Sequence, residues 1–237
     1  MSQAIRVGLM VPQNNTTMEP ELAAWLPEGS VIDLARIPRG PGTLTRADIP
    51  AYMRAAIDLA ARFRDSDVDV IAYGCTAAGF LSGPEGDAEI AAALAETTGK
   101  PVVTTARAMV AALAAQGLQR IAVVTPYRAE VNDQLTAFLG ASGIAVRQLN
   151  TFDAATTDEL GRITAPQVAK LTRETIAPED QGAFIACAQL PTHAVLDQLS
   201  DEAGRPVWSS IKATAWQICQ TLSCPFPDNR APAHTAH

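Results

Sequence analysis

Two cysteines are the residues best placed to do chemistry in this sequence, because each stands at the end of an apolar run. Cys75 follows the run Val68–Gly74, and Cys187 follows the run Gly182–Ala186. A continuous apolar run that ends in small or polar residues is typical of a strand buried on both faces of a parallel sheet. Ligands bind at the carboxyl edge of such sheets. Two thiols at that edge could act as a nucleophile or as bases towards one bound molecule.

An internal repeat gives the two cysteines equivalent positions. Three pairs of segments match in the same order along the chain: Val7–Pro12 with Ile121–Pro126, Cys75 with Cys187, and Gly99–Thr105 with Gly204–Ser210. Such self-similarity indicates two copies of one structural module. If the copies face each other about a pseudo-twofold axis, both thiols reach the cleft where equivalent strand ends meet. The alternative is that both cysteines are small core residues, since free cysteine is among the most buried residue types.

The elements that must position these residues alternate between strand and helix. Strands are expected at Ile5–Val11, Val31–Ala35 and Lys100–Thr105, and helices at Ala47–Phe63 and Asp87–Thr97. This alternation predicts parallel βαβ units with right-handed crossovers. The predicted fold class is therefore α/β, with two halves that each contain a parallel four-stranded sheet flanked by helices, and with the site in the cleft between them.

The repeat also predicts the boundaries of the two halves. The first half is expected to comprise residues 1–105 together with 207–223, and the second to run over 106–206. The final helix, near Ser210–Thr221, should return to the first half. The last residues, 224–237, have too few apolar side chains to pack and are expected to be disordered.

Two connections near the sheet edge are expected to shape the site. The turn after the first strand should begin a helix, with Thr16 and Glu19 at the spacing of a capping box. The segment Pro38–Thr45 is rich in glycine and proline. It should therefore be irregular, and in this position it could fold over the site.

The composition restricts the class of function. The chain of 237 residues is 48% hydrophobic and has a net charge of -7, so it can form a full-sized core but has no basic stripe for nucleic acid or an anionic membrane. It has no export-signal pattern, and no apolar run approaches the roughly 20 residues of a membrane span. We therefore expect a cytoplasmic protein that acts on a small molecule, without a nucleic-acid or membrane partner. A homodimer through exposed apolar helix faces is a further expectation.

Neither the cysteines nor the histidines predict a metal site. The four cysteines match no zinc spacing and are expected to be reduced in a chain of this length without an export signal. Cys219 and Cys224 are assigned to the final helix and its end. His193 is the sole histidine outside the tail, and its place at an expected helix start favours a solvent-facing or capping role over a catalytic one.

The sequence resembles the aspartate/glutamate racemase superfamily, in its branch of maleate cis-trans isomerases and arylmalonate decarboxylases. The resemblance covers the chain to about Thr221 and is carried by these segments: Val11–Glu19, Gly74–Thr76, Thr125–Tyr127 with Val131–Asn132, and Ala186–Pro191. It implies a cofactor-independent enzyme with two flavodoxin-like halves and a small carboxylate substrate. By the matching motifs, the implied catalytic residues are Cys75 and Cys187, and the implied substrate-binding residues are Asn15, Thr76, Ala77, Tyr127, Asn132 and Ala188.

The sequence departs from each branch of the family at specific positions. Thr76 stands where typical maleate isomerases have an apolar residue, and Thr156 or Thr157 stands where they have an asparagine. Arylmalonate decarboxylases, by resemblance, have a glycine in place of Cys75. The cysteine at this position therefore favours chemistry with two thiols over decarboxylation.

The chemistry requires a stabilised thiolate and donors for negative charge. A free thiol has a pKa of about 8.5, so it is a useful nucleophile near neutral pH when donors or a helix N-terminus stabilise its thiolate. Backbone N–H groups, the Asn15 amide and the hydroxyls of Thr76 and Tyr127 could hold a carboxylate and an enolate-like charge. Asn15 could instead cap a helix, and Tyr127 could be a core aromatic with a satisfied hydroxyl.

Cis-trans isomerisation of a small unsaturated dicarboxylate such as maleate is the first hypothesis. The Cys75 thiolate would add to one alkene carbon, the carbon–carbon bond would rotate, and elimination would give the trans product, with Cys187 handling the proton. The alternatives are an amino-acid or hydantoin-type racemase that uses both cysteines as a two-base pair, an arylmalonate decarboxylase-like enzyme, and a catalytically silent protein that binds small anions.

Overall fold

The strands form two four-stranded parallel sheets with the same order, β2-β1-β3-β4 and β6-β5-β7-β8, in a computed structural model that describes residues 4–40 and 42–228. The strands are β1 (Arg6–Pro12), β2 (Val31–Ile37), β3 (Val70–Tyr73), β4 (Val102–Thr104), β5 (Arg120–Thr125), β6 (Ala145–Thr151), β7 (Gly182–Ile185) and β8 (Val207–Ser209). This strand order is that of flavodoxin-like sheets. It confirms the predicted α/β fold of two similar halves.

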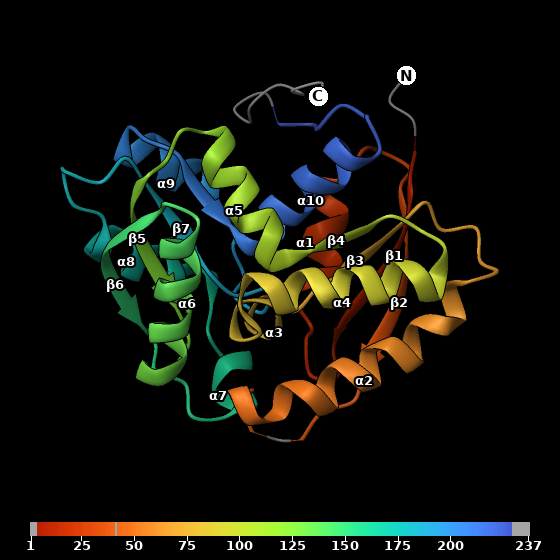
Figure 1. Ribbon diagram of the computed structural model, residues 1–237. Coiled ribbons are helices and arrows are strands. Elements are labelled where there is room, and N and C mark those ends of the chain that lie inside the picture. The colour runs from red at the N-terminus through yellow and green to blue at the C-terminus, as the bar shows by residue number, and fades with distance from the viewer. Residues whose placement is uncertain (1–3, 41, 229–237) are drawn as a thin grey trace.

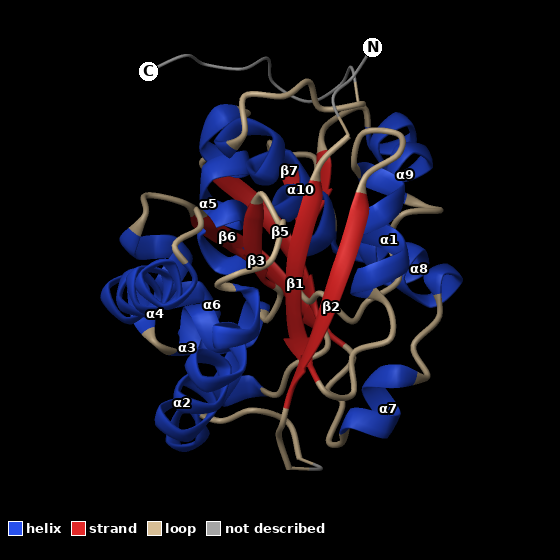
Figure 2. Ribbon diagram, turned by 90° about the vertical axis from the view of Figure 1, so that its right-hand side faces the viewer, coloured by secondary structure: helices blue, strands red, loops and turns tan. Residues whose placement is uncertain are grey.

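Helices cover both faces of the sheets (Figures 1 and 2). They are α1 (Met18–Trp25), α2 (Ile49–Ala60), α3 (Thr76–Leu81), α4 (Gly83–Thr98), α5 (Thr105–Ala115), α6 (Ala129–Ala141), α7 (Thr157–Gly161), α8 (Ala165–Thr175), α9 (Leu196–Ala203) and α10 (Ser210–Thr221), with 3-10 turns at Arg46–Asp48 and Ala61–Phe63. Figure 2 shows α2, α3 and α4 on one side of the first sheet and α1 on the other. In the described part of the chain, no helix has the length and apolarity that crossing a membrane requires.

Helices α5 and α10 pack against each other between the two halves (Figure 1). Their buried faces are joined by a hydrogen bond between the hydroxyls of Thr214 and Thr105, 3.1 Å apart. The last helix also contacts α1 and β4 of the first half. These contacts agree with the expected return of the chain, while the proposed boundaries at 105/106 and 206/207 stay a prediction.

The repeat is visible at the level of single glycines. Gly99 ends α4 and Gly204 ends α9, and both adopt left-handed backbone angles, with φ of 69° and 62°. Glycine takes this conformation without steric cost, and it is the usual residue after a helix end. The matched segments Gly99–Thr105 and Gly204–Ser210 therefore perform the same task, which is to end a helix and lead into the last strand of each sheet.

The turn between β1 and α1 does not form the expected capping box. Helix α1 begins at Met18 with Thr17 at its N-cap, and no N-cap side chain accepts a hydrogen bond there. Instead, Asn15 Oδ1 accepts from the backbone N–H groups of Thr17 and Met18, at 3.0 and 2.9 Å. The prediction for Thr16 and Glu19 was therefore wrong, because an earlier side chain already satisfies the helix start.

The end of the described chain is packed. Phe226 stacks on Trp25 with ring centroids 6.1 Å apart, Cys224 is buried, and Asp228 pairs with the buried Lys212 at 2.5 Å. These contacts differ from the expectation that disorder begins at residue 224. The remainder of the expected tail, 229–237, lies outside the described residues.

The described residues show no exposed apolar helix face of the kind expected to support a homodimer. Among the residues that the structure describes, Val31 is the one large hydrophobic side chain that is exposed, and it lies on β2. No exposed apolar helix face is therefore found in this part of the chain. The oligomeric state stays a prediction.

Candidate active site

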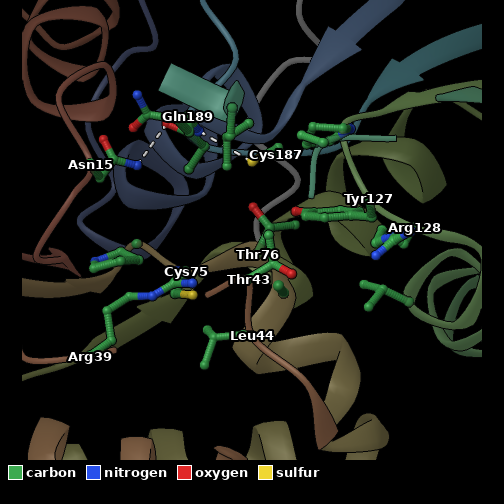
Figure 3. Close-up of a pocket in the computed structure, with 18 residues that line it drawn as sticks. Asn15, Arg39, Thr43, Leu44, Cys75, Thr76, Tyr127, Arg128, Cys187 and Gln189 are labelled. Carbon is green, nitrogen blue, oxygen red and sulfur yellow. Dashed lines mark hydrogen bonds between the residues drawn. The ribbon is translucent and has the colours of Figure 1, made fainter. Parts of the chain in front are cut away.

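A cavity lies between the two halves, where β1, β3, β5 and β7 end (Figure 3). Apolar side chains and a few convergent polar groups line it, which is typical of a site for a small molecule. The residues that line it are Pro12, Asn15, Arg39, Thr43, Leu44, Gly74, Cys75, Thr76, Ala77, Pro126, Tyr127, Arg128, Val131, Ala154, Leu160, Cys187, Ala188 and Gln189. All of the sequence-predicted site residues except Asn132 are among them.

Gly74 allows the backbone to pass close to its neighbours immediately before Cys75. A Cβ atom at this position would lie 2.5 Å from Met18 Sδ and 2.9 Å from Val11 Cγ1, so a larger residue does not fit without movement of its neighbours. The chain therefore passes close to β1 and α1 as it leaves β3. Cys75 follows at the N-cap of α3.

Cys75 is buried among groups that stabilise its thiolate. Burial raises the pKa of the Cys75 thiol above its ordinary value, because a charge is less stable away from water. Four groups oppose that rise: the Ala78 N–H, the Tyr52 hydroxyl, the Arg39 guanidinium and the Ala77 N–H. The first turn of α3 and a tyrosine of α2 thus provide the donors that a thiolate nucleophile needs.

Cys187 has similar surroundings in the second half. Its sulfur accepts a hydrogen bond from the Gln189 N–H at 3.4 Å. Burial raises the pKa of the Cys187 thiol, the Gln189 N–H and the Tyr127 hydroxyl lower it, and negative charge on Cys75 raises it. Because ionisation of one thiol disfavours ionisation of the other, the arrangement disfavours two thiolates at the same time.

Tyr127 and Thr76 point into the cavity between the two thiols (Figure 3). Burial, and then charge on Cys187, raise the pKa of Tyr127 well above its ordinary value, so this hydroxyl stays a donor. It lies close enough to Cys187 to feel that charge, yet it makes no hydrogen bond of normal geometry with the described residues. The Phe80 ring packs edge-on against Tyr127, with centroids 5.5 Å apart, and holds it in place. Tyr127 therefore places a donor beside Cys187 inside the cavity.

Asn15 caps a helix and also lines the cavity. Its carbonyl caps α1, and its Nδ2 donates to the Ala188 carbonyl at 3.0 Å. That bond joins the first half to the loop that carries Cys187. Because an amide nitrogen has two donors, the second one remains available at the cavity wall.

Asn132 does not line the cavity, and it forms hydrogen bonds to the residues next to it. Its Oδ1 accepts from the Thr125 hydroxyl at 2.7 Å, and its Nδ2 donates to the Tyr127 carbonyl at 2.8 Å. Both bonds hold the turn between β5 and α6. The structure therefore places Asn132 where it holds the Tyr127 backbone and outside the cavity lining, and its predicted substrate-binding role stays a prediction.

Sequence reasoning missed several groups near the thiols. Tyr52 contacts Cys75 from α2, and the cavity lining includes Arg39, Thr43, Leu44, Arg128 and Gln189. The expectation that Pro38–Thr45 folds over the site is confirmed for the three residues of that loop that line the cavity. The position of the loop in the chain was the feature of the sequence that indicated this. Tyr52 gave no such signal, because an aromatic residue on a buried helix face is as well explained by packing.

The rim of the cavity joins loops of both halves. Asn14 Nδ2 donates to the Thr157 hydroxyl at 3.0 Å, and Gly42 pairs with Thr156 in an isolated antiparallel bridge. Thr156 and Thr157, which stand where an asparagine was expected, are therefore used in closing the rim and do not line the cavity.

Two further links hold the halves at a fixed spacing. The Gln189 side chain accepts from the Thr16 N–H at 3.0 Å and donates to the Thr16 hydroxyl at 3.1 Å. The Glu21 carboxylate accepts from the N–H and the hydroxyl of Thr192, at 2.7 and 2.9 Å. Both links bind the loop after β7 to the start of α1.

His193 takes no part in the cavity. It is exposed and lies edge-on to the Trp25 ring, with centroids 4.7 Å apart. This position agrees with the solvent-facing role that the sequence favoured. Within residues 4–40 and 42–228, no group of three or more His, Cys, Asp or Glu side chains is placed to hold a metal ion.

Comparison with known proteins identifies relatives over nearly the whole chain. The maleate isomerase of Geobacillus stearothermophilus is 26% identical over 239 residues, which cover 94% of each chain. The structure of the Nocardia farcinica maleate cis-trans isomerase bound to TRIS has a TM-score of 0.87 and 27% identity, and covers 94% of this chain and 95% of its own. A cysteine-to-serine mutant of that enzyme, with a covalently bound succinylcysteine intermediate, has a TM-score of 0.86 and 27% identity, and covers 95% of this chain and 96% of its own.

A family model described as arylmalonate decarboxylase matches residues 7–235. The match spans both halves and every residue of the cavity lining. The chain therefore belongs to the arylmalonate decarboxylase family, in the branch of the aspartate/glutamate racemase superfamily that also contains the maleate isomerases.

Proposed function

We propose that this protein is an isomerase that converts maleate to fumarate. The observation that carries the proposal is the pair of buried thiols that reach one cavity from opposite halves of the molecule, each beside its own tyrosine. The succinylcysteine intermediate of the Nocardia farcinica relative supports covalent chemistry at one of two such cysteines. A second thiol is unnecessary for a decarboxylase of the kind that the sequence resembles.

The reaction begins when the Cys75 thiolate adds to one alkene carbon of maleate. The new S–C bond forms as the π electron pair moves to the other alkene carbon and into its carboxylate, which gives an enediolate. Cys187 donates its proton to that carbon, so the adduct is a succinyl thioether. Rotation about the former double bond is then free. Cys187 takes the proton back, the S–C bond breaks, and fumarate leaves with Cys75 restored as the thiolate.

The other cavity residues supply charge stabilisation in this mechanism. The hydroxyls of Tyr127 and Thr76 hold the enediolate oxygens, and the remaining Asn15 N–H holds a substrate carboxylate. The Thr76 hydroxyl donates to Ser210 Oγ at 3.1 Å, so it turns its proton to the substrate and accepts from the Ser210 hydroxyl in this step. These donors belong to a preorganised, buried site, where each is worth more than in water. The reaction requires no external oxidant, reductant or cofactor, because the added and eliminated groups balance. The protein is further proposed to act in the cytoplasm, where its thiols stay reduced.

Proton NMR of the purified protein with maleate in deuterated water tests this function. Isomerisation converts the maleate signal to that of fumarate. A racemase would instead exchange the α-proton of aspartate, glutamate or a hydantoin, and a decarboxylase would release carbon dioxide from an arylmalonate. If maleate stays unchanged while one of those substrates reacts, the isomerase proposal is rejected.

A further inference from the structure

Arg39 brings a positive charge to the wall of the cavity beside Cys75. It comes from the loop between β2 and α2, is half-buried, and extends towards the Cys75 sulfur in Figure 3. Its Nη2 donates to the carbonyl of Gly42 in the same loop. No ion pair found among the described residues involves Arg39. The charge of Arg39 acts weakly on the Asp48 carboxylate, which accepts hydrogen bonds from the N–H and hydroxyl of Thr45.

The other arginine of the cavity is placed differently. Arg128 is 62% exposed and pairs with Asp153 at 3.7 Å, so its charge lies at the solvent-facing rim. The groups that most lower the pKa of Cys187 are N–H and hydroxyl groups, whereas the groups that lower the pKa of Cys75 include the Arg39 guanidinium. Arg39 is therefore the cation placed beside a thiol.

This asymmetry matters because the proposed substrate is a dianion. Its entry beside a thiolate would bring three negative charges into one buried cavity, which is costly unless a cation or several donors face them. The hydroxyls of Tyr127 and Thr76 can serve one carboxylate. The second carboxylate needs a partner near the attacked carbon, and the unpaired guanidinium of Arg39 is the group in reach of it.

We propose that Arg39 binds the carboxylate on the alkene carbon that Cys75 attacks, and thereby restricts the substrates to dicarboxylates. The inference rests on the proposed function and specifies the orientation of the substrate in it. With one carboxylate held by Arg39, the displaced electron pair moves away from Cys75 into the other carboxylate, towards Tyr127 and Thr76.

Alkylation of Cys75 tests this proposal without turnover. Iodoacetate carries a carboxylate on the carbon that the thiolate attacks, as the substrate does, whereas iodoacetamide is its neutral counterpart. In a Cys187→Ser background, the rates of modification of Cys75 by both reagents are followed by peptide mass spectrometry. We expect Arg39→Gln to lower the ratio of the iodoacetate rate to the iodoacetamide rate by about tenfold, the usual value of a charge-assisted contact. Arg39→Lys should retain most of the ratio.

Arg46→Gln is the matched control, because Arg46 is exposed on the adjacent turn and does not line the cavity. It should leave the ratio unchanged. A variant that misfolds changes both alkylation rates, whereas loss of a carboxylate site changes mainly the rate with iodoacetate. An Arg39→Gln ratio equal to that of the parent overturns the proposal.

The experiments distinguish a failure of the Arg39 proposal from a failure of the isomerase proposal. If the parent produces fumarate and Arg39→Gln keeps the parent's KM for maleate and its alkylation ratio, Arg39 is not the carboxylate partner, and the isomerase proposal stands. If the parent leaves maleate unchanged but the ratio falls in Arg39→Gln, the carboxylate site is real and the substrate is a different carboxylate.

Discussion

Cys75 and Cys187 share one cavity, but their surroundings give them different tasks. Hydrogen-bond donors act on both thiols and each charge would oppose the other, but the positive charge of Arg39 acts on Cys75. In a coupled pair of this kind, the first proton leaves from the better stabilised site. Cys75 is therefore suited to nucleophilic attack, and Cys187 is suited to give and take a proton.

Serine variants should separate these tasks. In Cys187→Ser, Cys75 can still add to maleate, and the adduct accumulates because its proton is not removed efficiently. In Cys75→Ser no adduct should form, because a hydroxyl is far too weak a nucleophile. Intact-protein mass spectrometry with maleate should show a mass gain for the first variant and none for the second. Both variants should lose turnover by at least about 10²-fold.

A mass gain for Cys75→Ser and none for Cys187→Ser would make Cys187 the nucleophile and Cys75 the acid. A loss of turnover in both variants without any mass gain would favour two-base racemisation over addition. Full activity in both would remove the thiols from the mechanism.

The buried thiols also predict how stability depends on pH. Burial raises the pKa of Cys75, Cys187 and Cys219 in the folded protein. Such groups contribute stability below their unfolded pKa and lose it as the pH rises towards the folded pKa, because the unfolded chain releases the protons first. Since an unfolded thiol ionises near pH 8.5, the free energy of unfolding should fall between about pH 7.5 and about pH 9.5.

Urea unfolding at these two pH values measures the effect. The Cys75→Ser/Cys187→Ser double variant should lose less stability than the parent over the same interval, although Cys219 still contributes. Equal losses in both proteins would assign the effect to other groups. The buried tyrosines titrate above this range, so they do not obscure the comparison.

At the scale of elements, the residues at strand ends could be predicted from the sequence. The loop residues that reach the site could not. Cys75 and Cys187 terminate apolar runs, and such runs can be recognised because burial on both faces leaves no polar positions. Asn132 was given a ligand role because its motif lies near the site, but its bonds run to the backbone of Tyr127. The role of Arg39 depends on the path of an irregular loop. No periodic pattern encodes such a path, so the sequence indicated the loop and not the residue.

Gly74 offers a test of how an element delivers its catalytic residue. In Gly74→Ala the new methyl group would meet Met18, Val11 and the Met10 carbonyl within 3.0 Å. We expect a loss of about 1–3 kcal/mol in the free energy of unfolding, from overpacking. Displacement of Cys75 should also reduce its rate of alkylation by iodoacetamide. Gly140→Ala is the control, because nothing lies within 4 Å of its added Cβ inside α6, and it should stabilise the protein by about 0.5–1 kcal/mol.

At the scale of the whole molecule, the repeat predicted the two sheets and their equivalence. Matched segments such as Gly99–Thr105 and Gly204–Ser210 perform equal tasks, so the comparison of one half with the other revealed the architecture. The contacts that set the distance between the halves could not be predicted in this way. Gln189 with Thr16, and Thr192 with Glu21, join residues far apart in the chain and have no counterpart within either repeat.

The contact between Glu21 and Thr192 leads to the final prediction, which concerns the spacing of the two thiols. Glu21→Ala removes the acceptor of the buried Thr192 N–H, so the free energy of unfolding should fall by about 1–3 kcal/mol. Turnover of maleate should also fall, because Cys187 is no longer held at a fixed distance from Cys75. The rate of alkylation of Cys75 by iodoacetamide should stay near the parent value, since α3 and Tyr52 belong to its own half. Glu28→Ala removes the same charge from an exposed position beyond α1 and should change neither quantity. If Glu21→Ala keeps both the stability and the turnover of the parent, the link between the loop after β7 and α1 does not control the geometry of the site.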